Sequence, residues 1–293
     1  MNYNEFTPKI GEKVKMNVNL PNNYKINKKD IILYAIAIII CIVALTIIVA
    51  IIFLGEDVVQ KNKVEIATEE EKIELRTNFE NMFKNNLTGE IQDIEKNNND
   101  KDYVYTALEA TNTSENNYSL NVHIPEINIK NDVITQINTD IAKRYKQEVS
   151  NVLNSKGKNT IYSIEYEAHV ENNILFLTIR SNLKQSNNAQ KLMIYTYNYD
   201  LKEQKSHTLD ELIQILNYDK AEIQNLINTE IKSQEENANS LKELGYSIYL
   251  RDSSSDIYKV ENSDYFFIKD GRLYIIYPYG NEAVTSEMDL VII

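Results

Sequence analysis

Cysteine, tryptophan, glycine and proline are scarce in this chain. Of its 293 residues one is cysteine, Cys41, and none is tryptophan, while glycine occurs seven times and proline four times. Cys41 lies inside a long apolar run, so disulfides and cysteine metal sites are excluded from the rest of the chain. A domain outside the cell must then depend on its apolar core alone. The many Asn, Lys, Ile and Tyr residues are typical of AT-rich coding and indicate a low-GC bacterium.

Histidine is also scarce, and no established catalytic motif occurs in the sequence. The three histidines are His123, His169 and His207. No two of them have the spacing of metal ligands on a helix, and H-E-x-x-H, Walker and G-x-S-x-G motifs are absent. His169 falls on the polar face of a predicted strand and His207 precedes a predicted helix cap, and all three histidines are expected to be ordinary surface or loop residues. The chain is predicted not to be an enzyme and to need no cofactor or metal.

The one long apolar run, residues 31–54, contains no charge and no proline. At about 1.5 Å per residue, a helix of this length spans roughly 36 Å, enough to cross a hydrocarbon core of about 30 Å. Lysines precede the run and acids follow it, which places the N-terminus in the cytoplasm and the C-terminal region outside. A secretory signal peptide would have a shorter apolar region and a small-x-small cleavage site. The sequence therefore predicts a single-pass protein of the bacterial plasma membrane with an uncleaved anchor.

Residues 1–30 form a basic cytoplasmic tail with six lysines and three acidic residues, a net charge of +3. Since the whole chain carries −12, residues 31–293 carry −15. This acidity favours cationic partners and argues against nucleic acid. Residues 13–20 alternate apolar and polar residues as a strand does. Because one strand is unstable alone in water, this segment either adds to the sheet of a cytoplasmic partner or is a disordered tail near anionic lipids.

Residues 55–101 are predicted to hold a juxtamembrane helix and a linker. Thr68 and Glu71 have the spacing of a capping box, and a helix is expected over residues 68–85. Its apolar stripe packs on the outer domain, pairs with a second copy of the chain, or lies on the membrane. Residues 96–102 are a polar linker. The stripe consists of Leu75, Phe79, Met82 and Phe83.

The rest of the chain predicts an α+β fold, in which helices pack on antiparallel sheets, divided into modules 102–200 and 201–293. In the first module we expect strands at 103–110, 118–124, 162–170, 174–181 and 191–199, with a hairpin loop at 111–117, Pro125 ending the second strand, and a helix capped by Asn131. In the second we expect helices that begin at Thr208 and Asp219, the latter ending at Gly245, and strands at 265–268, 272–277 and 287–293, with the hairpin turn at Asp270-Gly271.

Aromatic residues provide the candidate site. Tyr274, Tyr277 and Tyr279 lie along a predicted strand and its exit loop. Tyrosines on one face of a strand stack on sugars or anchor a protein partner. The alternative is that they pack in the sheet. A pair of Asp or Glu side chains acting as a glycoside hydrolase is a further alternative, since acidic residues are abundant.

Three stretches resemble a known family: residues 118–127 with the helix over 131–149, the helix start at 209–213, and residues 266–279 with the terminal strand 287–293. Together they resemble the paired extracytoplasmic modules of RsiV-type membrane anti-sigma factors and the non-catalytic N-terminal part of PdaC-type peptidoglycan deacetylases, and most nearly the uncharacterised single-pass clostridial members. In RsiV-type proteins this region recognises lysozyme, and cleavage near the membrane releases a sigma factor. The tail of 30 residues here lacks the amphipathic helix expected for holding a sigma factor.

The expected function is that of a single-pass, membrane-anchored binding or sensing protein of the bacterial envelope. Its ligand would be a cell-wall glycan or a cationic protein such as lysozyme. A wall-modifying hydrolase with an Asp/Glu site and a membrane-anchored structural scaffold, with the helix over residues 68–85 for self-association, are the alternatives.

Overall fold

The computed structural model describes residues 37–38, 61–64, 67–114, 118–154, 159–279 and 287–293. The predicted tail 1–30, with its segment 13–20, and the predicted span 31–54 therefore lie outside the described residues, except that residues 37–38 are helical. Among the described residues, no helix is both long and apolar enough to cross a bilayer. The chain divides into two compact units, Met1–Gln60 and Lys61–Ile293. All that follows concerns the second unit.

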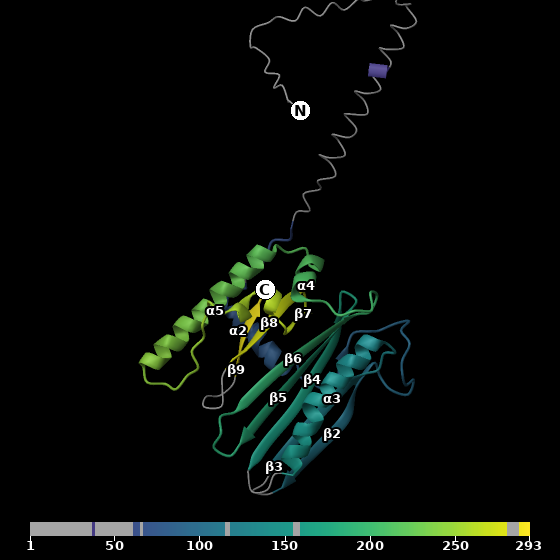
Figure 1. The fold of residues 1–293 in the computed structure, drawn as a ribbon, viewed down its shortest axis with the longest axis vertical. Coiled ribbons are helices and arrows are strands. Elements are labelled where there is room, and N and C mark those ends of the chain that lie inside the picture. The colour runs from purple at the N-terminus through teal and green to yellow at the C-terminus, as the bar shows by residue number, and fades with distance from the viewer. Residues whose placement is uncertain (1–36, 39–60, 65–66, 115–117, 155–158, 280–286) are drawn as a thin grey trace, which may run out of the picture. The chain divides into compact units, whose positions relative to one another are not determined.

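The described part of Lys61–Ile293 is a mixed α+β fold with antiparallel-rich sheets and four α-helices (Figure 1). The helices are α2 (Glu69–Asn81), α3 (Asp132–Leu153), α4 (Leu209–Ile215) and α5 (Lys220–Glu243), with short 3-10 turns η1 (Asp256–Tyr258) and η2 (Val260–Asn262). The strands are β1 (Leu87–Thr88), β2 (Val104–Ser114), β3 (Tyr118–Ile127), β4 (Thr160–Glu171), β5 (Ile174–Gln185), β6 (Lys191–Asp200), β7 (Phe266–Lys269), β8 (Arg272–Tyr279) and β9 (Glu287–Ile292).

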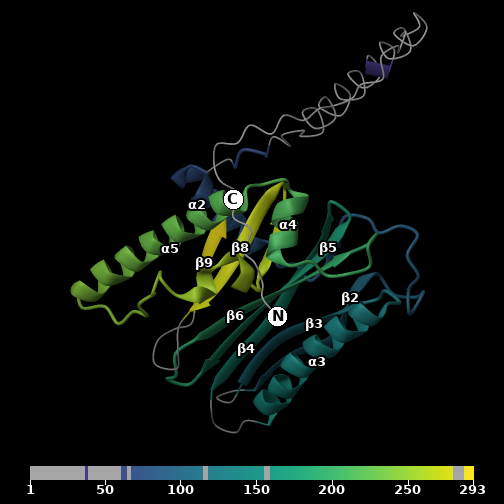
Figure 2. The same ribbon diagram turned by 45° about the horizontal axis from the view of Figure 1, so that its top comes forward.

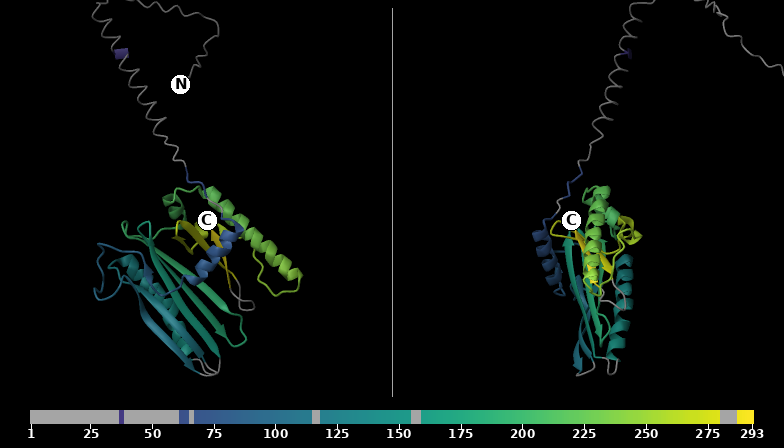
Figure 3. Two further views of the ribbon diagram at one scale, coloured as in Figure 1. Left: turned by 180° about the vertical axis from the view of Figure 1, so that it is seen from behind. Right: turned by 90° about the vertical axis from the view of Figure 1, so that its left-hand side faces the viewer.

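The larger sheet has the order β2-β3-β4-β5-β6, and α3 lies along one of its faces (Figures 1 and 3). β3 and β4 are parallel and joined through α3, while the other pairs on this path are antiparallel. β1 pairs with β4 beyond the point where β3 leaves it, at Leu87↔Ala168. In β5, Leu175 and Leu177 belong to the core under α3, whereas Ile174 and Phe176 belong to the second core. This strand is thus buried on both faces.

The second core forms around the small sheet β7-β8-β9, together with α2, α4 and α5 (Figure 2). α5 contacts β9 and buries Ile223, Ile227 and Ile231. Residues from β5 and β6 also enter this core, so it draws on both sides of residue 200. The predicted division into modules at 200 and 201 remains a prediction.

The helix starts predicted from capping residues are confirmed. Thr68 and Thr208 each form a complete capping box with the glutamate three residues later. Asn131 accepts a hydrogen bond from the Val133 N–H, and Asp219 caps α5 in the same way. These signals are reliable because a cap is made by atoms only two or three residues apart.

α2 packs within its own unit, which is the first of the three alternatives for its apolar stripe. Phe79 is buried and stacks near the rings of Phe267 and Tyr274, with centroids 6.1 and 6.4 Å away. The helix ends at Asn81, four residues before the predicted end. Met82 and Phe83 follow it and are buried in the same core.

The hairpin β2–β3 differs from the prediction. β2 continues to Ser114 through part of the predicted loop, and Pro125 lies inside β3, where it was expected to end the strand. Pro125 pairs with Thr106, and the register shifts between Thr106 and Leu108. Because proline has no N–H to donate, a strand tolerates it at such an irregularity.

Candidate functional site

The three candidate tyrosines do not share one exposed surface. Tyr274 and Tyr277 are 4% and 3% exposed and lie in the second core. The Tyr277 hydroxyl hydrogen-bonds Ser263 Oγ at 2.7 Å, and burial raises the pKa of Tyr277. These two residues therefore pack in the sheet, as the alternative interpretation had it, and offer no ring to a ligand. Tyr279 is half-buried.

Tyr279 covers a buried ion pair. The Arg251 guanidinium lies 3.6 Å from its ring centre and donates to both carboxylate oxygens of Asp289, at 2.9 and 2.7 Å. Tyr249 stacks near Tyr279 with centroids 6.2 Å apart. Arg251 and Asp289 are almost fully buried, so this arrangement joins β9 to the segment after α5. A ligand role for Tyr279 remains a prediction.

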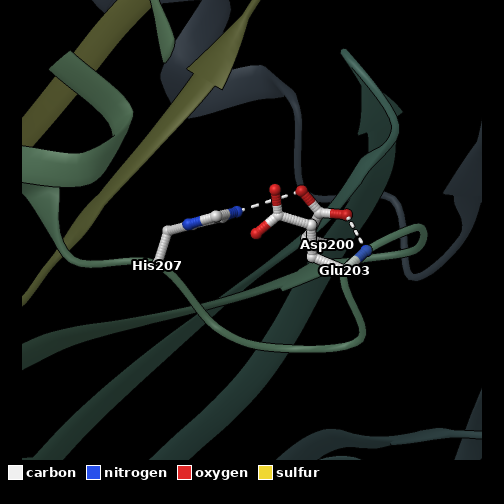
Figure 4. A group of neighbouring side chains, drawn as sticks. All are labelled: Asp200, Glu203 and His207. Atoms are coloured by element: carbon white, nitrogen blue, oxygen red, sulfur yellow. Dashed lines mark hydrogen bonds and ion pairs between the residues drawn. The ribbon is translucent and has the colours of Figure 1, made fainter. Parts of the chain in front are cut away.

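A cluster of three ionisable side chains at the end of β6 has the composition of a metal site. Asp200, Glu203 and His207 offer ligand atoms within 4.8 Å of one another. Figure 4 shows both carboxylates at the Nε2 end of the His207 ring. Asp200 Oδ2 accepts a hydrogen bond from His207 Nε2 at 3.0 Å, and Asp200 Oδ1 accepts the N–H groups of Lys202 and Glu203 at 2.8 and 2.6 Å. Asp200 therefore closes the turn between β6 and α4.

A nitrogen and two carboxylates are ligands that zinc accepts. Here, however, the three groups already have partners within the chain. Glu203 pairs with Lys205 Nζ at 3.0 Å, and the His207 nitrogen on the side of the carboxylates, Nε2, is bonded to Asp200, which accepts three hydrogen bonds in all. The unpartnered atom, His207 Nδ1, points away from the two carboxylates and lies 3.7 Å from Glu211 Oε2. The cluster thus fits a structural role in the turn better than a metal site.

A cluster around His169 corrects the prediction that this histidine is an ordinary surface or loop residue, because His169 lies within β4 and is 4% exposed. His207 lies in the loop before α4, as expected, although it is only 6% exposed. His169 Nδ1 bonds Glu167 Oε2 at 2.9 Å, and its Nε2 bonds the Ile268 carbonyl at 2.5 Å. Lys269 completes the cluster with an ion pair to Glu167. The part of the polar face of β4 that holds Glu167 and His169 is therefore covered by the β7–β8 hairpin and joined to it.

The pKa shifts of Glu167 and Asp200 predict how the free energy of unfolding changes with pH. Burial alone would raise the pKa of Glu167, but hydrogen bonds and charges from His169 and Lys269 outweigh it and lower that pKa. The pKa of Asp200 is lowered likewise, against burial, by the Glu203 N–H, His207 and the Lys202 N–H. A carboxylate whose pKa is lower in the folded state than in the unfolded state stabilises the fold at pH values above its unfolded-state pKa, which is about 4 for these groups. That stabilisation is lost as the pH falls through the folded-state pKa.

We therefore expect the free energy of unfolding to be flat with respect to these groups near neutral pH and to fall below about pH 4.5. Urea denaturation of the full-length protein in detergent, followed by circular dichroism between neutral and acid pH, measures this. The Glu167→Gln variant should show a shallower acid decline than the wild type. An identical decline in both would contradict the assignment to Glu167.

A groove opens where β3 leaves β4 and β1 takes its place. We call it the β1–β2 groove. It has a volume of about 510 Å³. It is lined by Asn85, Asn86, Leu87, Gly89, Ile91, Lys96, Asp102, Tyr103, Val104, Tyr105, Thr106 and Tyr166.

Backbone and hydroxyl hydrogen bonds hold the walls of this groove. Asn85 exchanges hydrogen bonds with the Tyr166 backbone, donating its N–H to the carbonyl at 2.8 Å and accepting the N–H on Oδ1 at 2.9 Å. The Tyr166 hydroxyl bonds Thr106 Oγ1 at 3.0 Å. The Tyr103 hydroxyl donates to the Ile94 carbonyl at 2.8 Å. Tyr103, which directly precedes β2, and Tyr105, within β2, are both half-buried, so each ring is fixed and partly accessible.

Lysines of the segment before β2 lie over these rings. Lys96 Nζ is 4.4 Å from the ring centre of Tyr103, and Lys101 Nζ is 5.5 Å from that of Tyr105. Burial and a hydrogen bond to Glu126 raise the pKa of Tyr105 to about 12, so its hydroxyl stays protonated. An exposed cation–π contact contributes about 0.5–1 kcal/mol, so a ligand that stacks on a ring can displace such a lysine.

The sequence interpretation missed this site. It placed residues 96–102 in a linker and Tyr103 and Tyr105 in an ordinary strand. The signal that was present is the run of asparagines at 97–99 within this segment, followed by Tyr103 and Tyr105. These residues can be recognised as parts of one site only when the pairing of β1 with β4 is known, because that pairing joins residues about 80 positions apart in the sequence.

No family model and no curated protein matches this chain. Among solved structures, it is similar to a DUF3298 family protein from Pseudomonas aeruginosa PAO1, with a TM-score of 0.36 and 9% identity over 61% of this chain and 83% of that one. It is also similar to a member of the DUF3298 family from Bacteroides fragilis, with a TM-score of 0.30 and 15% identity over 53% of this chain; it spans 60% of that protein. The resemblance to RsiV-type and PdaC-type modules stays a prediction. The structural neighbours are DUF3298 family proteins, and their names state no activity.

Proposed function

We propose that this chain is a membrane-anchored binding and sensing protein of a bacterial envelope. Residues 31–54 would hold it in the plasma membrane with residues 1–30 in the cytoplasm, and residues 61–293 would bind an extracytoplasmic ligand without catalysis. The ligand would be a wall component or a cationic protein such as lysozyme.

The observation that carries this proposal is how early the chain becomes part of the fold after the predicted span. Lys61 Nζ pairs with Asp219 Oδ2 at 2.8 Å. The Asn62 N–H donates to the Asn217 carbonyl at 2.8 Å, and Asn62 Nδ2 donates to the Leu216 carbonyl at 2.8 Å. Only residues 55–60 separate the predicted span from these contacts, and α2 then enters the second core. A change in the folded unit can therefore reach the anchor through a short connection.

The surroundings of the buried histidines support binding without catalysis. His169 bonds Glu167 and the Ile268 carbonyl, and His207 bonds Asp200. Each links two elements of the fold, and neither belongs to the lining of the β1–β2 groove. A general base must instead reach the proton that it removes.

Cysteine labelling tests the membrane topology. In a Cys41→Ser background, Ser233→Cys places a thiol at an exposed position of α5, and Asn4→Cys places one in the tail. A membrane-impermeant maleimide added to intact cells should label the first and should label the second only after lysis. Labelling of the tail alone in intact cells would overturn the proposal.

Ligand capture tests the binding function. The full-length protein in detergent is incubated with purified wall sacculi and, separately, with immobilised lysozyme. We expect retention on at least one of them and no release of soluble wall fragments. Retention on neither, or release of fragments at a rate proportional to protein concentration, would contradict a binding protein.

A further inference from the structure

We infer that the β1–β2 groove is a carbohydrate site, which takes an uncharged stretch of N-acetylated amino sugars, as in the sugar backbone of a bacterial wall glycan. This inference rests on the proposed function and names the ligand class and the site for it.

The volume of the β1–β2 groove and its exposure to solvent suit a carbohydrate ligand. The groove volume of about 510 Å³ lies within the range of roughly 300–1,000 Å³ of small-molecule sites. Its lining combines buried, half-buried and exposed residues, with Asn86 and Asp102 exposed to solvent. A ligand can therefore reach the groove from the surface, as a segment of a long chain must.

The chemistry of the lining matches a pyranose ring. Tyr103 and Tyr105 offer aromatic rings, which pack on the C–H face of a sugar. The Asn86 amide and the Asp102 carboxylate make no hydrogen bond to any part of the chain that the structure describes. They can therefore donate to and accept from sugar hydroxyl and acetamido groups without breaking a contact.

Charge decides between a glycan and a basic protein. The charged residues of the lining are Lys96 and Asp102, so the groove itself is neutral although the chain carries −12. A site built for a cationic protein would concentrate acidic residues where the partner binds. The neutral lining instead suits an uncharged ligand.

The groove is also held in shape before any ligand arrives. Asn128, which is buried, accepts the Asn98 N–H on Oδ1 at 2.9 Å. Its Nδ2 donates to the carbonyls of Asn98, Lys101 and Asp102, at 2.6, 3.2 and 3.2 Å. The chain leading into β2 is thereby fixed at the mouth of the groove, which lowers the cost of ordering it on binding.

The test is calorimetric titration of the full-length protein in detergent with a soluble hexamer of N-acetylglucosamine. We compare the wild type with Asn86→Ala and Asp102→Asn, which alter exposed groove residues without breaking an internal contact. Asn237→Ala and Asp264→Asn make the same chemical changes at exposed positions outside the groove. Each groove variant should bind about tenfold more weakly, as expected for one lost hydrogen bond, with an unchanged melting temperature. The two controls should bind like the wild type.

If the wild type, the two groove variants and the two controls all bind the hexamer equally, the inference is overturned and the proposed function stands. The same holds if lysozyme binds, the hexamer does not, and the groove variants retain lysozyme as the wild type does. If the hexamer does not bind and neither sacculi nor lysozyme are retained, both the inference and the proposed function fail.

Discussion

Replacing Glu167 by alanine is expected to lower the free energy of unfolding of the folded unit by about 3–5 kcal/mol, the usual effect of removing one partner of a buried ion pair. Glu167 is 2% exposed and bonds both His169 and Lys269. Without it, the Lys269 ammonium and the His169 ring lose the carboxylate that compensates their burial. Urea denaturation of the full-length protein, monitored by circular dichroism, measures the loss.

Glu165 supplies the matched control, because it lies two residues away on the same face of β4. Its carboxylate pairs with Arg180 at 2.9 Å, but its side chain is 28% exposed. Glu165→Ala should therefore cost less than about 1 kcal/mol. If both variants lost the same stability, the Glu167 cluster would not be what joins β4 to the hairpin β7–β8.

The second large effect is expected at Phe79, on α2. Phe79→Ala should cost about 3–5 kcal/mol, because it removes a buried ring and leaves a cavity. The cavity would lie between α2 and the small sheet, where Phe79 meets Phe267, Tyr274 and, edge to face at 5.6 Å, Phe83. The same denaturation experiment measures it.

Ile73 provides the control on the same helix, since its side chain is 67% exposed. Ile73→Ala should change stability by no more than about 0.5 kcal/mol. The pair also addresses the scaffold alternative. If Ile73→Ala dissociated an oligomer of the full-length protein in gel filtration, α2 would serve self-association as well as packing.

Most of the secondary structure could be predicted from residues close to one another in the sequence. The caps of α2, α3, α4 and α5 were readable because each joins atoms within three residues. The turn at Asp270-Gly271 was readable for the same reason, and both residues have positive φ. Strand ends were less accurate. Pro125 was expected to stop a strand, and only the register shift in β2, on the partner strand, lets it remain inside β3.

The faces of β4 show where sequence interpretation ends. Its alternation predicts one apolar and one polar face, and the apolar residues Tyr162, Ile164 and Tyr166 are buried as expected. Alternation does not reveal what covers a polar face. Here the β7–β8 hairpin, about 100 residues later, buries Glu167 and His169 and provides their partners. A histidine expected at the surface thus became part of the contact between two sheets.

The sequence by itself determined the acidic charge, the lack of cysteine outside residue 41, the α+β class, and the helices with their caps, while the anchor and its orientation stay predictions. These follow from composition, and from interactions between residues near one another in the chain. Only the tertiary structure decided that α2 packs into the core, that Tyr274 and Tyr277 are buried, and that residues of the segments 85–89 and 103–106 line one groove. The reason is that burial and pairing depend on contacts between residues about 80 to 200 positions apart, which no local pattern encodes.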